Sequence, residues 1–355
     1  MDILPAYVWT DLIFALLFVI FVAYVLGVRK KTVELGRRLE LMDFAKGIAI
    51  ITVVCVHVVN VVPEGRVLDP YIGFGVELFI LCSGYLLARR YADGLETREY
   101  LKKMFFRVVL IYALFVVAIY LATSWQSFSA VDLAAAFLLG SQNGNGLYFI
   151  PVIIQLYLLF PLIRGNWKKH ALALLLAVLV VSLVWNYFDS QLRKPDWNSN
   201  QYVLAFAGRY LFFFVFGIWL SAFALEKLEA KKAAAIAAFY LAGAVTATIL
   251  GHDLFLGYAY PVFALFACVL LYKWLDGIGA LRQIVGAVNK LGKQSLLIYL
   301  VHAMLLYGIV SKIPLPIGWQ GEYAAYAAAT LALSYAVAVL FMKAYRRLTG
   351  FSALA

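Results

Sequence analysis

The sequence predicts an all-α polytopic membrane protein of about eleven transmembrane helices, and its composition, apolar runs and loop charges each support this fold class. Of the 355 residues, 65% are hydrophobic and 14% are charged, whereas a soluble domain is roughly 45–50% apolar and about 25% charged. So much apolar surface needs lipid to cover it. The composition therefore excludes a cytosolic enzyme, a disordered regulator and a DNA-binding domain, and it makes the lipid bilayer the expected partner, with no nucleic acid.

Eleven apolar runs are long enough to span a bilayer, since a helix rises about 1.5 Å per residue and needs roughly 20 residues. They cover 7–27, 44–62, 71–88, 104–123, 147–164, 169–187, 203–225, 233–250, 254–275, 294–311 and 322–342. The first run is expected to be an anchor, because Asp2 precedes it and its basic residues follow it, unlike a cleaved signal peptide. The segment 131–140 is too short to span and is predicted to be an interfacial or re-entrant helix.

The loop charges give the predicted orientation. Six loops hold 25 of the 30 Lys and Arg residues, and the positive-inside rule places these loops in the cytoplasm. The loops are 29–46, 89–107, 164–170, 226–232, 273–293 and 343–347. An odd number of helices then leaves the N-terminus outside and the C-terminus inside a multi-pass plasma-membrane protein. We expect an extra helix and linker at 1–40, one transmembrane domain at 41–347 and a cytoplasmic tail at 348–355.

Two ionisable residues lie at membrane depth in consecutive runs. His57 follows Lys46 by 11 residues, which places it about 16 Å above the cytoplasmic surface. Glu77 precedes Arg89 by 12 residues, which places it about 18 Å above that surface. A carboxylate that accepts from one imidazole nitrogen raises the basicity of the other. We therefore predict that Glu77 orients His57 as a general base; the alternative is a packing pair in which the two groups only satisfy each other.

Two further ionisable residues lie within apolar runs, where charge is costly and marks functional sites. His302 is about 13 Å deep, counted from Lys293. It is either a structural histidine bonded to a neighbouring helix or a member of the site. Arg107 lies within MFFRVVLIYALF and needs an anionic partner or a wet cavity. The phosphates of a cytosolic cofactor are a suitable partner.

Basic residues surround Arg107 at the predicted inner surface. The densest patch consists of Arg89, Arg90, Arg98, Lys102, Lys103 and Arg107. Such a patch is a positive-inside signal that also meets anionic lipid. On the predicted outer side, Arg209 lies near the interface, and Asn145 belongs to the polar loop SQNGNG. These residues suit carbohydrate hydroxyls, although polar residues are also ordinary in outer loops.

The motifs of several runs resemble those of the integral membrane acyltransferase 3 family. Lys46 and His57 match its basic residue and histidine separated by ten residues, and ELFILCSGYLL matches its phenylalanine-containing run that ends in Ser-Gly-aromatic. LGKQSLLIYLVH matches its Gly-x-x-Ser and Tyr-Leu-x-His signature, and LYFIPVIIQLYLLFPLI resembles its aromatic-Pro-Leu helix. The matches occur in the family's order over residues 43–302. We therefore identify a resemblance that covers most of the chain.

The resemblance implies transfer of an acyl group, usually acetyl, from cytosolic acyl-CoA to a hydroxyl of an extracytoplasmic sugar or glycolipid. His57 would act as general base or as nucleophile. The donor site would include Lys46, Ser83, Lys102, Lys103, Arg107, Tyr299 and His302, with Ser83 and Tyr299 as candidate hydrogen-bond donors to the oxyanion. Arg209 and Asn145 would contact the acceptor. No metal is expected, because His57, Glu77 and His302 have no recognised metal-ligand spacing.

The sequence departs from the family pattern in three places. Lys46 stands where Arg is commoner, and lysine lacks the bidentate fork for phosphate. Arg107 begins Arg-Val-Val-Leu instead of the usual Arg-Leu-x-Pro, and the run 7–27 is an addition to ten core helices. Two other functions stay open. One is a glycan or lipid flippase or proton-coupled transporter that uses the same buried residues, and the other is a non-catalytic membrane scaffold.

Overall fold

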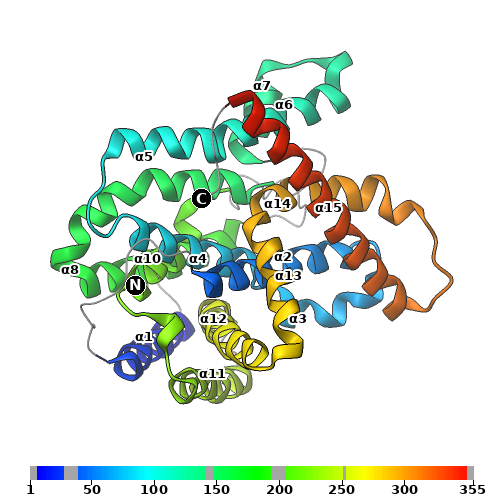
Figure 1. The fold of residues 1–355 in the computed structure, drawn as a ribbon. Coiled ribbons are helices and arrows are strands. Elements are labelled where there is room, and N and C mark those ends of the chain that lie inside the picture. The colour runs from blue at the N-terminus through cyan, green and yellow to red at the C-terminus, as the bar shows by residue number, and fades with distance from the viewer. Residues whose placement is uncertain (1–5, 28–38, 141–146, 193–204, 251–252, 350–355) are drawn as a thin grey trace.

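The computed structural model describes residues 6–27, 39–140, 147–192, 205–250 and 253–349, and every regular element in these ranges is a helix (Figure 1). The main helices are α1 (Ala6–Leu26), α2 (Glu40–Val59), α3 (Asp69–Ile72), α4 (Gly75–Arg90), α5 (Thr97–Met104), α6 (Leu110–Ser124), α7 (Ala130–Leu139), α8 (Phe149–Leu192), α10 (Leu211–Leu220), α11 (Ala230–Leu250), α12 (Asp253–Gly277), α13 (Arg282–Lys293), α14 (Ser295–Gly308) and α15 (Trp319–Thr349). A π-helical turn, η2 (Phe105–Val109), joins α5 to α6.

Several of these helices are suited to cross a membrane. Six stretches of the described residues are long and apolar enough: Glu40–Val59, Pro63–Arg90, Thr97–Ser124, Ala259–Gly277, Ser295–Lys312 and Trp319–Leu348. They coincide with six of the predicted runs. The predicted run 203–225 contains instead the ten-residue helix α10 after a short turn. The structure confirms that the regular elements of the described residues are all helices and that several are apolar and of spanning length, while the total of eleven spans stays a prediction.

The short helix predicted at 131–140 is present as α7. Its N-terminus is capped by Ser129, whose hydroxyl accepts a hydrogen bond from the Asp132 backbone N–H at 3.2 Å. Its C-terminus is Gly140, whose φ of 66° lies in the left-handed region that glycine adopts without strain. With ten residues, α7 is about 15 Å long, half the thickness of the hydrocarbon core.

Helix α8 differs from the prediction of two spans joined by a loop at 164–170. Its backbone is helical without interruption from Phe149 to Leu192, and it turns back at one edge of the molecule (Figure 1). Pro161 lies inside this helix, where its ring removes one backbone hydrogen bond and favours a bend. The polar residues that follow contain no second proline. The polar segment 164–170 therefore lies where α8 changes direction, and the helix does not end there.

Helices α4 and α10 cross in direct backbone contact at two glycines. A Cβ atom on Gly84 would meet the carbonyl oxygen of Phe214, and one on Gly217 would meet the carbonyl oxygen of Leu81. Small residues permit such close approach between membrane helices. The Ser-Gly-aromatic motif of the sequence therefore has a packing role at its glycine.

The same two helices run in the same direction. The Tyr85 hydroxyl donates to the Phe223 carbonyl oxygen at 3.0 Å, and Arg89 forms an ion pair with Glu226 at 3.0 Å. Both contacts join the last turns of α4 to residues that follow α10 in the chain. This parallel arrangement agrees with the predicted topology, in which the runs 71–88 and 203–225 both begin on the outer side.

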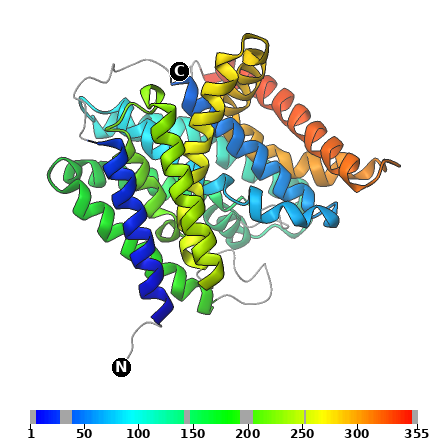
Figure 2. The ribbon, with the colours of Figure 1, turned by 90° about the horizontal axis from the view of Figure 1, so that it is seen from below.

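Helix α2 lies at the centre of the bundle. It packs against α4, α12, α13, α14 and α15. Close packing on α13 depends on Gly292, where a Cβ atom would meet the carbonyl oxygen of Asp43. Helices α1, α11 and α12 form a neighbouring group, in which the three lie side by side (Figure 2). Most side chains of α2 are therefore buried or half-buried against neighbouring helices.

Candidate active site

His57 lies in the last turn of α2 and faces α14. Its ring centroid is 4.8 Å from that of His302, with the planes 70° apart. Its Nδ1 atom is 3.3 Å from the hydroxyl oxygen of Tyr307. Within the described part of the chain, Nε2 of His57 forms no hydrogen bond. The structure therefore brings together two histidines that the sequence separates by 245 residues.

Tyr307 links His57 to a second polar residue of α2's C-terminus. The Nδ2 atom of Asn60 donates to the Tyr307 hydroxyl at 3.1 Å. The same hydroxyl is 3.4 Å from the His57 carbonyl oxygen. The sequence prediction missed both residues. A signal for Asn60 was available, because it follows His57 by three residues, the spacing of one helix face.

His302 is a buried residue of α14, with 1% of its surface exposed. Its Nδ1 atom is 2.7 Å from the carbonyl oxygen of Tyr299, one turn earlier. A carbonyl oxygen only accepts, so the neutral ring carries its proton on Nδ1. Nε2 then has a lone pair, and it is buried without a hydrogen-bond partner among the described residues. This orphaned atom is unusual for a purely structural histidine.

Among the described residues, the structure shows no hydrogen bond between Glu77 and His57, and His57 Nδ1 faces the Tyr307 hydroxyl instead. Glu77 lies in the first turn of α4, whose first residue, Gly75, lies against Ala49, Thr52 and Val53 of α2. His57 is four residues beyond Val53, about 6 Å farther along α2. Glu77 therefore lies at least one helical turn closer to the N-terminal end of α2 than His57 does. Counting residues from the cytoplasmic surface places both at one depth only if both helices are straight and untilted.

Glu77 is instead associated with Arg209, whose positive charge acts on its carboxylate. The first turn of α4 also favours the negative charge through the helix dipole. One carboxylate oxygen, Oε2, is buried and has no hydrogen-bond partner among the described residues. Tyr210, the neighbour of Arg209, is hydrogen-bonded to Tyr148. Two predicted site residues, one called catalytic and one acceptor-binding, thus form a second polar group below the histidines.

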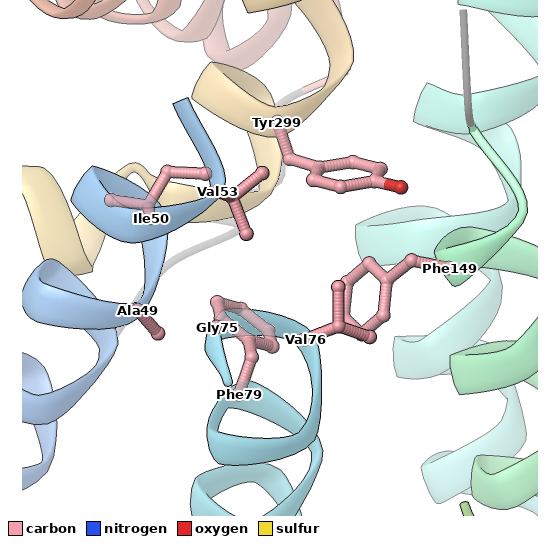
Figure 3. A pocket seen from close by; sticks show the side chains of 8 residues that line it. All are labelled: Ala49, Ile50, Val53, Gly75, Val76, Phe79, Phe149 and Tyr299. Carbon is pink, nitrogen blue, oxygen red and sulfur yellow. The ribbon is translucent and has the colours of Figure 1, made fainter. Parts of the chain in front are cut away.

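An apolar cavity lies against Ala49, Ile50 and Val53 of α2, which come between Lys46 and His57 in the sequence (Figure 3). It is lined by Ala49, Ile50, Val53, Gly75, Val76, Phe79, Phe149 and Tyr299. The rings of Phe149 and Tyr299 are in edge contact, with centroids 5.1 Å apart. The cavity volume is about 10 Å³, close to the minimum space for one water molecule. Tyr299 is the predicted site residue that lines it.

Two further predicted donor residues are Lys46, in the N-terminal half of α2, and Ser83, in the middle of α4. Lys46 forms an ion pair with Asp43 at 3.1 Å, and both side chains are largely buried. The Ser83 hydroxyl donates to the Phe79 carbonyl oxygen at 2.9 Å and is also hydrogen-bonded with Tyr157. Lys46 therefore has a carboxylate partner within its own helix, with which a phosphate would have to compete.

Arg107 lies in the π-helical turn η2. Such turns are rare and are frequent at functional sites. Its Nε atom is buried and has no hydrogen-bond partner among the described residues, and the like charge of Arg90 acts on it. Lys102 is exposed, and Lys103 is half-buried. An unpaired guanidinium nitrogen beside another cation is suited to bind an anion. Asn145 lies outside the described residues.

The comparison with known families agrees with this arrangement. Residues 39–339 match the acyltransferase domain of the acyltransferase 3 family, which covers α2 through most of α15 and leaves α1 outside the match. No curated protein and no solved structure matches the chain. The matched region contains both histidines, the cavity and the Glu77–Arg209 group. The chain belongs to the acyltransferase 3 family and is a membrane acyltransferase.

Proposed function

We propose that the protein is an O-acyltransferase that moves an acyl group, most suitably acetyl, from cytosolic acyl-CoA to a hydroxyl of an extracytoplasmic glycan or glycolipid. The observation that carries this proposal is the pair of imidazoles, His57 and His302, beside an apolar cavity inside the bundle. An imidazole within an apolar helical bundle costs free energy to bury, so its presence there favours a chemical role. The cavity is lined by Val53 and Tyr299, about one helical turn before His57 and His302, and it would have to widen to admit an acetyl group.

His57 is the proposed reacting base. Its Nε2 atom would take the proton of the acceptor hydroxyl while the oxygen attacks the thioester carbonyl carbon. The tetrahedral intermediate then expels the thiolate, which recovers the proton, and an ester replaces the thioester. In a second version of the step, Nε2 attacks the thioester carbonyl carbon and expels the CoA thiolate; the acceptor oxygen then takes the acyl group from the acyl-histidine, and the hydroxyl proton goes to the thiolate. Both versions need the same nitrogen.

Donor binding is proposed along the predicted cytoplasmic half. Lys46, Lys102, Lys103 and Arg107 would bind the phosphates of CoA, with the orphaned Arg107 Nε as the strongest support. Tyr299 lines the cavity and Ser83 does not, so Tyr299 is better placed to meet the carbonyl oxygen. The small cavity favours acetyl over longer chains. His302 would face the thioester with its Nε2 lone pair.

Acceptor binding is proposed for Glu77, Arg209 and Asn145. The buried Glu77 Oε2 has an unused lone pair that suits a donor hydroxyl of a sugar. The N-terminus outside and the cytoplasmic C-terminus follow from the loop charges, and the plasma membrane is the location that completes the proposal.

Mass spectrometry of envelope glycans and glycolipids tests this function. Three strains are compared: one without the gene, one complemented with the wild type and one with His57→Ala at equal membrane abundance. We expect an ester-linked acyl mass only with the wild type. Normal acylation by His57→Ala would contradict the mechanism. Glycans that are lost from the surface on deletion, yet have no acyl ester in the wild type, would favour a flippase.

A further inference from the structure

The Tyr307 hydroxyl connects three groups at the end of α2. The Asn60 amide nitrogen lies at 3.1 Å, the His57 Nδ1 at 3.3 Å and the His57 carbonyl oxygen at 3.4 Å. These contacts join α14 to the last turn of α2, next to the imidazole pair. The Tyr307 hydroxyl makes the contact with His57 that the sequence analysis predicts for Glu77.

The protons in this network can be counted. A phenolic hydroxyl has one proton to donate and lone pairs to accept with, and the Asn60 NH₂ group only donates. If the hydroxyl proton goes to the His57 carbonyl oxygen, the second lone pair faces Nδ1, which must then carry a proton. If the proton goes to Nδ1, the carbonyl contact is not a hydrogen bond. All three contacts are satisfied only when His57 is protonated on Nδ1.

We propose that Tyr307 and Asn60 are positioning residues that hold His57 as the Nδ1–H tautomer, so that the Nε2 lone pair is kept for the reacting proton. The role in catalysis rests on the proposed acyl transfer, whereas the tautomer does not. The hydroxyl oxygen does for His57 what a carboxylate does for a catalytic histidine, namely accept from one nitrogen and leave the other basic. A neutral hydroxyl avoids placing a further charge at this depth.

His302 provides an internal reference for this assignment. Its Nδ1 faces the Tyr299 carbonyl oxygen at 2.7 Å, and a carbonyl cannot donate, so its tautomer is determined by the contact alone. Both imidazoles then have their lone pairs on Nε2. The two rings differ in the partner of Nδ1. For His57 it is the side chain of Tyr307, which can be substituted, and for His302 it is a backbone carbonyl oxygen, which cannot.

Nitrogen NMR of histidine-labelled protein in lipid nanodiscs measures the tautomers directly. The chain has four histidines, so His57→Asn and His302→Asn suffice to assign the two rings. At a pH where the rings are neutral, we expect a pyrrole-type Nδ1 and a pyridine-type Nε2 for both. Tyr307→Phe should change the His57 signals and leave those of His302 in place. A pyrrole-type Nε2 at His57 in the wild type, or His57 signals that ignore Tyr307→Phe, would overturn the proposal.

Acyl transfer from labelled acetyl-CoA to an envelope extract gives the second readout. Tyr307→Phe should lower kcat roughly tenfold or more, because general-base catalysis contributes about 10²–10⁴-fold. The KM for acetyl-CoA should be unchanged, since Tyr307 touches no donor residue. Asn60→Ala should have the same effect in smaller degree. Tyr323→Phe is the matched control, because it removes a hydroxyl that donates to the Cys55 carbonyl oxygen of the same helix, at 3.0 Å, without contacting His57.

The two readouts separate the possible failures. An inactive wild type with the expected tautomer would refute acyl transfer and leave the positioning of His57 intact. An active wild type whose kcat survives Tyr307→Phe would refute the positioning and leave acyl transfer intact. An equal loss in Tyr307→Phe and Tyr323→Phe would show that packing, not the tautomer, is at stake, and would also overturn the proposal.

Discussion

At the scale of single residues, the candidate site consists of two polar groups that lie at different levels along α2. His57 and His302 form one, and Glu77 with Arg209 forms the other, nearer the middle of α2. A carboxylate beside a guanidinium inside a helical bundle is costly to separate, because the remaining charge is left in low dielectric. The Glu77–Arg209 group therefore has a structural consequence as well as the proposed role toward the acceptor.

A double-mutant cycle tests the coupling of these two charges. Glu77→Gln keeps the shape of the side chain and should destabilise the protein by about 2 kcal/mol, since it leaves the arginine without its carboxylate. Arg209→Gln should do the same, and the double variant should be more stable than the sum of the two losses implies. Thermal unfolding in detergent, followed by loss of the monodisperse elution peak, measures this. Additive losses would show that the charges are independent.

The cavity leads to a prediction about acyl chain length. Phe149→Ala removes a ring from its wall and should raise the preference for butyryl-CoA over acetyl-CoA at least tenfold, because each methylene group in an apolar pocket contributes roughly 1–3 kcal/mol. The ratio of kcat/KM for the two donors measures it. Phe160→Ala is the control, since Phe160 is a fully buried residue of the same helix that does not line the cavity. An equal change in both variants would argue against an acyl pocket.

At the scale of helices, the direct contact between α4 and α10 depends on residues without side chains. Gly84→Ala should destabilise the protein by about 2 kcal/mol or more, because its Cβ would meet the backbone of Phe214 and the helices would have to separate. Gly286→Ala in α13 has open space around its Cβ and should be neutral or stabilising by about 0.5–1 kcal/mol. Thermal unfolding of the two variants distinguishes them. Equal stability would mean that the helix crossing is not tight.

The helices show which features a sequence predicts well. Apolar runs such as 44–62 and 322–342 correspond to helices, because the hydrophobic content of a span is a local property. The bend of α8 was missed, since polar residues at 164–170 are compatible with either a loop or a curved helix. The site followed the same division. His57 and His302 were identified from motifs, whereas the depth of Glu77 depends on where α4 begins relative to α2, which is a matter of packing.

At the scale of the whole molecule, the predicted orientation can be tested by cysteine labelling. The three native cysteines, Cys55, Cys82 and Cys268, are buried or half-buried and are replaced by alanine for the experiment. Lys312→Cys should then react with a membrane-impermeant maleimide in intact cells, and Lys290→Cys only after the membrane is opened. Both lysines are exposed, so accessibility does not limit the reaction. The reverse pattern would invert the topology and with it the donor and acceptor sides.

The smallness of the cavity has a consequence for the membrane itself. Under the proposed function the enzyme receives one substrate from each side of the membrane, and a water-filled path between the two sides would let protons cross. The cavity lined by Ile50, Val53, Phe79 and Phe149 has a volume of about 10 Å³, which is too small for a continuous file of water molecules at this position. Under that proposal, the apolar lining that would limit the acyl group to a short chain would also limit proton leakage through the protein.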